Sequence, residues 1–336
     1  MKALMITAMY PTPERPFYGT FVRTQVESLK QAGVDVEVLV LQGRSHKLMY
    51  PKGIVQMRRR LAEGTADLVH AHYGLVGMVA RMQWRVPVVV TYHGDDLLGT
   101  RDPNGNITFE SKVIVVAGQI LGKYVDAVIV QSQEMARKLR HANVHVIPHE
   151  VDFDLFAPRD REQARAVLEL DLEKTYLLFA ADPRIPVKRF PLARAVADQL
   201  RRQDPSIEFL VVHQEPQHRL ALYLNACDAL VFTSYQEGSP NVIKQAMACN
   251  LPIAATDVGD VRQIIAGTPG CYVCSPDVSE FTMRLTEILR QRQRTNGRAQ
   301  IQHLACPAVA QQVIGVYEET LRKHRAGRRK TAWQFP

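Results

Sequence analysis

Short apolar runs alternate with amphipathic segments along most of the chain. The first half predicts strands near Ala3–Met9, Val34–Leu41, Leu68–Ala71, Val86–Tyr92, Ala127–Val130 and Val144–Ile147. The second half predicts strands near Tyr176–Ala181, Ile207–His213, Ala229–Thr233, Pro252–Thr256 and Cys271–Val273. Continuous apolar strands separated by helical segments are typical of parallel sheets that carry helices on both faces. The pattern therefore predicts an α/β protein with two doubly wound, Rossmann-like units.

The clearest predicted helix lies between the first two strands. Val22, Val26 and Leu29 share one face of it, and Gly33 ends it. The IPHEVDFDLFAP segment near the middle of the chain is the predicted hinge. We therefore predict an N-terminal domain over 1–150, a C-terminal domain over 151–307, a C-terminal helix over 308–325 and a loose tail over 326–336.

Composition fits an ordinary globular protein of two domains. The 336 residues are 46% hydrophobic and 23% charged, which is enough chain for two domains of about 150 residues each. The first apolar run is too short to span a membrane and lacks a small-residue cleavage site, so we interpret it as a buried strand. The odd number of cysteines, five, without a secretion signal favours a reduced, cytoplasmic protein.

A metal site is not expected. Cys271 and Cys274 have the C-x(2)-C spacing of a zinc site, but no second pair follows at a suitable distance. The segment around them reads as a short strand instead.

The net charge of +8 indicates a surface that prefers anions. The basic residues outside the predicted core include Arg58, Arg59, Arg60, Lys323, His324, Arg325, Arg328, Arg329 and Lys330. They could meet acidic lipid headgroups or a phosphorylated acceptor. Nucleic acid is not expected, since the chain lacks interleaved aromatics, zinc spacing and a recognition-helix pattern.

The segment Tyr235–Pro252 combines a carboxylate, a Gly-Ser turn and a helix start directly after the apolar strand Ala229–Thr233. Ser239 is suited to cap that helix, and Pro240 is suited to its first position. The free amides of a helix start favour phosphate or sugar oxygens, and ligands bind at the carboxyl ends of parallel strands. The segment predicts an anion site, although one more strand–turn–helix unit of a nucleotide-type fold explains it equally well.

Two other loops also follow predicted strands. Arg184, Lys188 and Arg189 lie between a buried strand and a helix, where three cations suit a phosphate better than they suit packing; an ordinary solvated basic turn is the alternative. Gly19 lies between the first strand and its helix, where it permits either close approach of an anion to the backbone or simply a tight turn.

Histidines cluster at the ends of two predicted strands. His93 follows Val86–Val90 and should lie at a carboxyl end, where a structural role is the alternative to ligand contact. His70 and His72 share one strand face, but no third metal ligand is evident. We interpret these two as lining the site or as structural.

The Tyr235–Pro252 segment resembles the E-x(7)-E element of retaining, GT-B fold glycosyltransferases of family 4, with Glu237 in the first position and Gln245 in the second. The resemblance implies two Rossmann-like domains facing across a cleft, with the C-terminal helix returning to the first domain. It also implies metal-independent transfer of a hexose or N-acetylhexosamine from a nucleoside diphosphate sugar to a hydroxyl acceptor. A UDP-sugar is the first expectation, and no cofactor is implied.

The resemblance assigns residues by their place in these motifs. It implies His93, Glu237 and Lys188 as catalytic. It implies donor binding by Gly19, Arg184, Arg189, Gly238, Ser239, Pro240, Asn241 and Gln245. It implies an acceptor side formed by Thr20, His72 and Asp95. Arg184 stands one position nearer to Lys188 than the family spacing, so either Arg184 or Arg189 serves as the second cation.

Two departures from the family pattern carry consequences. An amide at Gln245 has one acceptor oxygen where a carboxylate has two, which concerns binding of the ribose hydroxyls. Between Val212 and Ala226 the chain lacks the strand and helix that many members insert, so the second domain should be trimmed by one such unit.

Two other functions share the predicted fold. One is a GT-B epimerase or phosphorylase, and the other is a catalytically degenerate scaffold or partner subunit, for which Gln245 is the only support. The basic residues predict peripheral contact with an anionic membrane at its cytoplasmic face and admit a lipid-linked acceptor.

Overall fold

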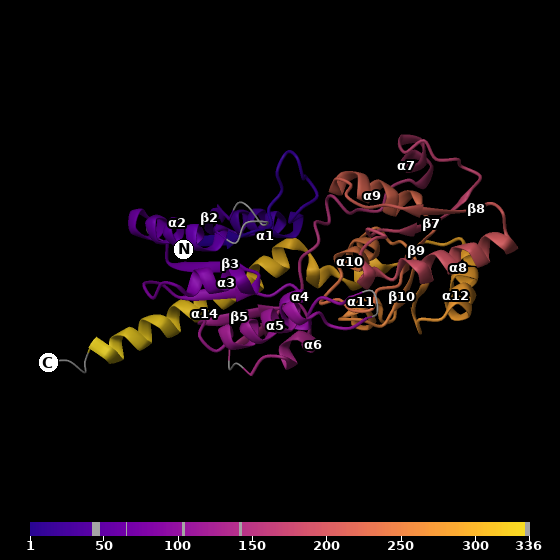
Figure 1. Cartoon of the computed structure of the whole chain (residues 1–336). Coiled ribbons are helices and arrows are strands. Elements are labelled where there is room, and N and C mark those ends of the chain that lie inside the picture. The colour runs from indigo at the N-terminus through magenta and orange to yellow at the C-terminus, as the bar shows by residue number, and fades with distance from the viewer. Residues whose placement is uncertain (42–47, 65, 103–104, 141–142, 333–336) are drawn as a thin grey trace. The chain divides into compact units, whose positions relative to one another are not determined.

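The computed structural model describes residues 1–41, 48–64, 66–102, 105–140 and 143–332, with only the backbone described from residue 328 onward. The chain divides into two compact units (Figure 1). Unit 1 comprises Met1–Thr100, Ile107–Glu150 and Cys306–Pro336. Unit 2 comprises Arg101–Asn106 and Val151–Ala305.

Unit 1 is built on a six-stranded parallel sheet with strand order β2-β1-β3-β4-β5-β6. Its strands are β1 (Lys2–Thr7), β2 (Asp35–Val40), β3 (Leu68–His72), β4 (Val88–Thr91), β5 (Ala127–Val130) and β6 (Val144–Val146). Its helices are α1 (Thr20–Gln31), α2 (Met49–Glu63), α3 (Gly74–Arg81), α4 (Asp95–Leu98), α5 (Phe109–Leu121), α6 (Gln133–Arg137) and α14 (Cys306–Ala332). Each of the six strands predicted for the first half of the chain is present.

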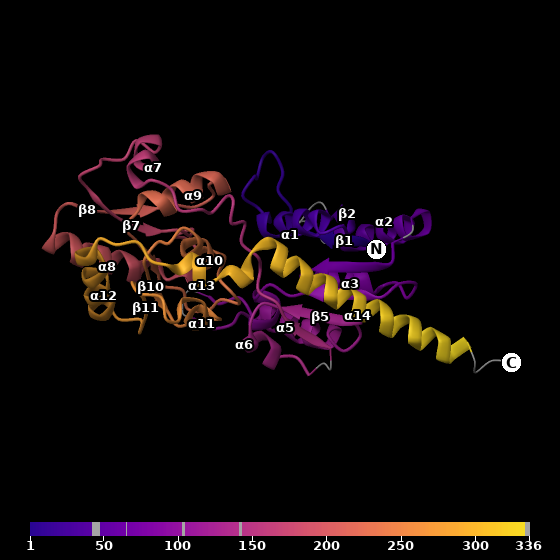
Figure 2. The ribbon, with the colours of Figure 1, turned by 180° about the vertical axis from the view of Figure 1, so that it is seen from behind.

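Two hydrophobic layers sandwich this sheet. On one side α1 and α14 pack through Val22, Val26, Leu29, Val313 and Tyr317, all nearly inaccessible to solvent; Figure 2 shows α14 running past α1. On the other side the core is filled from α2, α3 and α6. The period of the apolar residues in the first predicted helix therefore identified its buried face correctly.

The C-terminal helix is longer than predicted. It continues to Ala332, past residue 325, where the sequence had suggested a loose tail. The added turns are rich in Arg, Lys and Ala, which are good helix formers, and contain no proline. None of the helices in the described ranges is both long and apolar enough to cross a bilayer.

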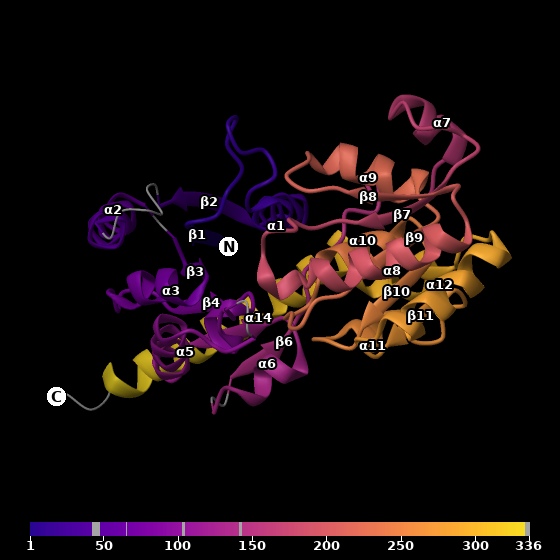
Figure 3. The same ribbon diagram turned by 45° about the vertical axis from the view of Figure 1, so that its right-hand side comes forward.

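Unit 2 is built on a five-stranded parallel sheet with strand order β11-β10-β9-β7-β8 (Figure 3). Its strands are β7 (Thr175–Phe179), β8 (Ile207–Val211), β9 (Ala229–Phe232), β10 (Ile253–Thr256) and β11 (Cys271–Cys274). Its helices are α7 (Arg161–Val167), η1 (Pro186–Lys188), α8 (Phe190–Gln203), α9 (Gln217–Ala226), α10 (Asn241–Ala248), α11 (Val261–Ile265), α12 (Val278–Gln291), α13 (Gly297–Gln300) and η2 (Gln302–Leu304). Only α9 connects β8 to β9, as the short sequence between them had indicated.

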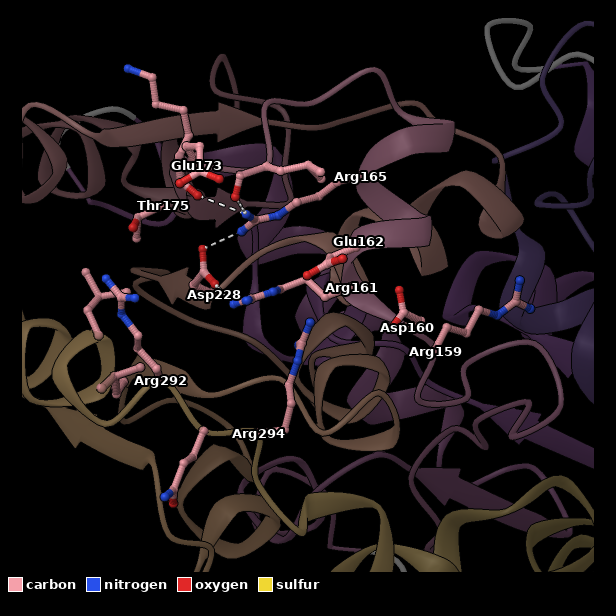
Figure 4. Close-up of a pocket in the computed structure, with 15 residues that line it drawn as sticks. Arg159, Asp160, Arg161, Glu162, Arg165, Glu173, Thr175, Asp228, Arg292 and Arg294 are labelled. Carbon is pink, nitrogen blue, oxygen red and sulfur yellow. Dashed lines mark hydrogen bonds and ion pairs between the residues drawn. The ribbon is translucent and has the colours of Figure 1, made fainter.

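Charged side chains line a cavity of about 540 Å³ at the amino-terminal edge of this sheet (Figure 4), and several of them pair with one another. Arg165 is almost completely buried, and its guanidinium donates to three carbonyl oxygens, those of Leu172, Lys174 and Ala226. It also donates to Asp228 Oδ2 at 2.9 Å, whose other oxygen accepts from Arg161. The network therefore ties α7 to the starts of β7 and β9.

Replacing Arg165 should destabilise unit 2 far more than replacing Arg161. Arg165→Met removes the donor to three carbonyls and the buried cation beside Asp228, whose Oδ2 keeps only the hydrogen bond from the Tyr176 amide. Breaking such a buried pair costs about 3–5 kcal/mol. Arg161 makes its bond to the same carboxylate while 45% exposed, so Arg161→Gln should cost no more than about 1 kcal/mol. Chemical denaturation of both variants measures the difference, and equal losses would contradict this account.

Candidate active site

Lys188 and Glu237 come together at the carboxyl-terminal edge of the sheet of unit 2. Lys188 ends η1 in the segment after β7, and Glu237 follows β9, the strand beside β7. The Lys188 Nζ atom lies 2.6 Å from Glu237 Oε1, which also accepts a hydrogen bond from Ser234 Oγ at 2.8 Å. The side chains are 26% and 17% exposed, so the pair is held by protein yet open to a ligand.

The two loops that carry this pair are bonded to each other. Thr233 Oγ1 donates to the carbonyl of Lys188 at 3.0 Å, and the Tyr235 amide donates to the carbonyl of Val187 at 2.8 Å. These contacts fix the separation of the ammonium and the carboxylate without using either charge. The sequence predicted both residues as site residues but did not indicate that they pair.

The other two cations of the loop already have partners. Arg184 makes two bonds to Asp182, at 3.0 and 2.8 Å, and these hold the pKa of that carboxyl well below its usual range. The Arg189 guanidinium lies 3.9 Å from the centre of the Tyr235 ring. Arg184 is thus engaged by a carboxylate. Within the described part of the chain, the Arg189 guanidinium meets only an aromatic face, which leaves its full charge available to an anion.

The helix start after Glu237 lies one residue later than the sequence suggested. Pro240 takes the capping position and Asn241 is the first residue of α10, with no side chain capping the first turn. Ser239 was expected to cap the helix with its hydroxyl, but it is buried in the preceding turn with Gly238. The uncapped first turn still presents backbone amides, which is what an anion requires.

Gln245 uses its amide nitrogen within unit 2. Its Nε2 donates to Gln217 Oε1 on α9 at 3.0 Å, which turns the donor end of the amide toward that helix. A side chain held in this way offers an incoming hydroxyl one oxygen acceptor and its second N–H, whereas a carboxylate would offer two acceptor oxygens.

Gly259, in the loop after β10, supports the Glu237 turn and was missed from sequence. Its φ of +58° is a left-handed conformation, and a Cβ there would lie 2.5 Å from the Gly238 carbonyl oxygen. Only glycine allows this close approach. The signal available was a lone glycine after a predicted strand, which is too common to single out.

In unit 1, three histidine rings form a stacked ladder around His93. The His93 Nδ1 atom lies 2.9 Å from His149 Nε2, and its Nε2 lies 3.2 Å from His72 Nδ1. Each neighbouring pair of rings is stacked, with centroids about 5 Å apart. His70 stands beside His72 and is hydrogen-bonded to Thr91 and to Tyr317 of α14. His149 was not predicted, since it lies in the segment interpreted as a hinge.

Burial keeps His72 and His93 uncharged. It lowers the pKa of His72 to about 3 and that of His93 well below its usual range, and the neighbouring histidines lower the pKa of His93 further. With neutral rings, each contact needs one N–H and one lone pair. The two contacts of His93 are therefore linked: the ring that donates at one end determines which nitrogen of His93 carries its proton.

The loop of His93 is held by Asp96 rather than by Asp95. The Asp96 carboxylate is fully buried and accepts hydrogen bonds from the amides of His93, Gly94 and Gly74. Burial raises its pKa to about 7, against the opposing effect of these amides. Asp95, nominated for the acceptor side, is the exposed member of the pair.

Two other nominated residues of unit 1 have a clear structural setting. Gly19 has φ +69°, and a Cβ there would lie 2.5 Å from the Met9 carbonyl oxygen, so the tight turn alone requires glycine; Thr20 then begins α1. His72 was expected on the acceptor side, but it is fully buried. It can influence a ligand only through His93.

Within the described ranges, no three His, Cys, Asp or Glu side chains are grouped so that they could hold a metal ion. Cys271 and Cys274 are free thiols on β11, which agrees with the interpretation of that segment as a strand.

Two family models match the chain. The model for the glycosyl transferase 4-like domain matches residues 11–151, and the model for glycosyl transferases group 1 matches residues 175–291. The D-inositol 3-phosphate glycosyltransferase of Frankia alni is 30% identical over 277 residues, which cover 68% of this chain and 67% of that protein. The chain belongs to the glycosyl transferases group 1.

Other proteins that this group 1 glycosyltransferase resembles carry different names. TuaC of Bacillus subtilis, whose name links it to teichuronic acid biosynthesis, is 26% identical over 329 residues, covering 79% of this chain and 83% of that protein. Among solved structures, sucrose-phosphate synthase of Thermosynechococcus elongatus aligns with a TM-score of 0.77 at 21% identity, covering 96% of this chain and all of the other. Anabaena HepE in complex with UDP aligns at 0.68 and 17%, covering 95% and 100%. These likenesses confirm the predicted GT-B fold.

Acid should destabilise the glycosyltransferase partly through His72. Its pKa is 6.5 in the unfolded chain and about 3 when folded, so the unfolded chain takes up the proton first as the pH falls. This contribution to stability is complete above pH 6.5 and is lost toward pH 3, at about 1.4 kcal/mol per pH unit. We expect His72→Gln to remove that slope.

Urea unfolding at several pH values between about 6 and 4 measures this slope. Asp96 titrates in the opposite sense, because its folded pKa is raised, but it is common to both proteins and cancels in the comparison. His303→Gln, at an exposed histidine, is the control and should keep the wild-type slope. Identical slopes in wild type and His72→Gln would show that His72 does not titrate as described.

Proposed function

We propose that the chain is a retaining glycosyltransferase that moves a hexose or N-acetylhexosamine from a nucleoside diphosphate sugar to a hydroxyl acceptor. The observation that carries the proposal is the preformed Lys188–Glu237 pair beside the uncapped start of α10. A cation and free amides suit the diphosphate, and a carboxylate suits sugar hydroxyls. UDP is the first choice of base, because HepE of the same fold has been captured with UDP and with UDP-glucose.

The chemical need is to stabilise a diphosphate leaving group while positive charge develops on the sugar carbon. Lys188, Arg189 and the first amides of α10 place positive charge where negative charge grows, so they favour the transition state over the bound substrate. We assign this task to protein cations, and the proposed reaction therefore needs no metal. Retention is supported by family resemblance: the acceptor attacks from the leaving-group side and the departing phosphate takes its proton.

His93 is the sugar-contacting group that we assign to unit 1. Because its pKa lies well below neutrality, it acts as a hydrogen-bonding partner rather than as a proton donor. His149 and His72 act as positioning residues, since their contacts select the nitrogen of His93 that carries the proton. Thr20 and Asp95 stay proposed for the acceptor side, and Arg189 is preferred to Arg184 as the second phosphate-binding cation.

The acceptor is proposed to be a growing polysaccharide, a glycolipid or another glycoconjugate, with a lipid-linked form preferred. The names of two relatives, one for teichuronic acid biosynthesis and one for D-inositol 3-phosphate, refer to different compounds, which supports no single acceptor for the family. The five free cysteines favour a reducing compartment, so we place the protein in the cytoplasm, at the inner face of the membrane when bound to it.

A donor-blind partner subunit is the second candidate. Gln245 supports it, because its amide is occupied by Gln217 and offers one acceptor in the position where the family has a carboxylate. Against it stands the Lys188–Glu237 pair, which a scaffold has no need to keep at a ligand-accessible edge.

Lys188→Ala should lower turnover at least about tenfold, because loss of a charge-assisted contact to a developing phosphate costs roughly 1.5–3 kcal/mol. Steady-state kinetics with UDP-sugars and a hydroxyl acceptor measure it. Lys174→Ala is the matched control, since Lys174 also pairs with a glutamate, Glu208, at 3.6 Å, but belongs to the opposite edge of the sheet. A loss of donor affinity at unchanged turnover would mean that Lys188 stabilises only the ground state.

Gln245→Glu should tighten UDP binding by about 1 kcal/mol, near fivefold, by restoring a second acceptor oxygen. The Gln217 amide can turn to donate its own N–H to the new carboxylate, so the α9 contact survives. Calorimetry with UDP compares the two forms, and Gln217→Ala reports what the α9 contact alone contributes. Weaker binding by Gln245→Glu would contradict the proposed ribose position, and no binding of UDP or GDP by either folded form would favour the scaffold.

A further inference from the structure

In helix α5 the small residues face the protein interior and the large apolar residues face outward. Its inner side consists of small residues, Ser111 and Gly118, together with Leu121. Its outer side carries Phe109, Val113, Val116 and Ile120, and the stripe continues to Tyr124 just after the helix; these five side chains, the α5 stripe, are 51–81% exposed. A contiguous apolar stripe of this kind on a soluble protein marks an interaction surface.

The close fit of α5 to the sheet explains why its large residues point outward. The Tyr92 hydroxyl donates to the carbonyl of Gly118 at 2.7 Å, and a Cβ on Gly118 would lie 2.9 Å from the Asp96 carbonyl oxygen. The helix therefore sits directly behind Asp96, the residue that holds the His93 loop. Whatever binds the α5 stripe is fixed in place relative to His93.

One flank of the stripe is basic. Lys112 and Lys123 are exposed on one side of it and form no ion pair with any residue in the described ranges. Glu110, in the first turn, is the only acidic residue of α5. An apolar stripe bordered by lysines is typical of a helix that lies in the interface of an anionic membrane.

The same layer of unit 1 extends this apolar surface. Figure 3 shows α2, α3 and α5 in a row on one side of the unit. Trp84, just after α3, is 71% exposed, and its ring is held by the Arg81 guanidinium 3.6 Å away. Arg81 in turn bonds to Asp126, two residues beyond Tyr124, so this tryptophan belongs to the neighbourhood of the stripe.

The arginines that first suggested membrane contact are less available. Arg58 donates twice to the carbonyl of Met82, Arg59 pairs with Glu63 at 2.7 Å, and Arg60 pairs with Glu37. Side chains from residue 328 onward, including Arg328, Arg329 and Lys330, lie outside the described residues. Unlike Arg59 and Arg60, Lys112 and Lys123 beside α5 have no ion-pair partner in the described ranges.

We propose that the α5 stripe, flanked by Lys112 and Lys123, docks unit 1 on an anionic lipid bilayer. The proposal rests on the proposed function only in its purpose, which is to bring a lipid-linked hydroxyl acceptor to the side of unit 1 that holds His93. A second copy of the chain is a poorer occupant, because two facing stripes would oppose lysines of like charge. Five side chains also fall far short of the roughly 20–30 residues per side of a standard protein interface.

Vesicle flotation tests the docking surface without any need for catalysis. At low salt the wild type should float with phosphatidylcholine vesicles that contain phosphatidylglycerol, and not with phosphatidylcholine alone; high salt should weaken the binding. Val116→Asp with Ile120→Asp should reduce the bound fraction at least about tenfold, since it puts charge into the inserted stripe. Val167→Asp is the matched control, because Val167 on α7 of unit 2 is 62% exposed and should have no effect.

Two further measurements keep the test independent of folding and of activity. Lys112→Gln with Lys123→Gln changes no apolar contact and should still lower binding to the anionic vesicles, with thermal melting confirming that each variant is folded. In a Trp333→Phe background, Trp84 fluorescence should be quenched by brominated lipid in anionic vesicles only.

The proposal is overturned if the Val116 and Ile120 double variant floats like wild type, or if neutral and anionic vesicles bind equally at low salt. A wild-type dimer in light scattering that the same double variant converts to monomer would assign the stripe to a second copy. Flotation as expected in a protein that transfers no sugar would count against the proposed function alone.

Discussion

All strands of a parallel sheet end at the same edge of the sheet. This constraint determines where side chains that could bind a ligand come together in each unit. In unit 2 it brings the segment after β7 beside the segment after β9, so that Lys188 and Glu237, far apart in sequence, lie 2.6 Å apart. The opposite edge of the same sheet carries the Arg165 network, in which nearly every donor is used by protein carbonyls or by Asp228. One edge is therefore closed by satisfied charges and the other keeps charges that a ligand can meet.

Unit 1 uses the same edge with neutral groups. His72 ends β3, and His93 follows the adjacent strand β4, so the two rings stack, and His149 after β6 completes the ladder. Burial disfavours the imidazolium forms of His70, His72 and His93. The ladder therefore orients His93 through hydrogen bonds, and burial leaves the His93 ring neutral. An oriented, neutral ring is consistent with the sugar-contacting role proposed for His93.

Much of the fold was predictable because apolar periodicity reports burial directly. All eleven strands, the buried face of α1 and the missing strand–helix unit after β8 were visible in the sequence. What escaped prediction depends on side chains meeting across elements. Neither the choice of Asp96 over Asp95 as the buried carboxylate nor the approach of Gly259 to Gly238 leaves a periodic signal. His149 lies in the segment that was interpreted as a hinge, so it was not considered as a site residue. The start of α10 differs by one residue from the prediction, which is the usual spread of helix ends.

Helix α5 shows that the spacing of apolar residues does not always identify the buried face of a helix. The run Val113 to Val116 is as apolar as a core segment, yet the inner positions are taken by Ser111 and Gly118, because the helix lies too close to Tyr92 and Asp96 for larger residues. The spacing of these apolar residues makes the helix amphipathic but does not show which face looks inward. The positive net charge by itself does not show which basic residues can meet a partner. Arg59 and Arg60, for example, are neutralised by glutamates on their own unit. Lys112 and Lys123 border exposed apolar residues. Positive charge beside an apolar stripe favours binding to a surface that is both anionic and apolar, such as an anionic membrane.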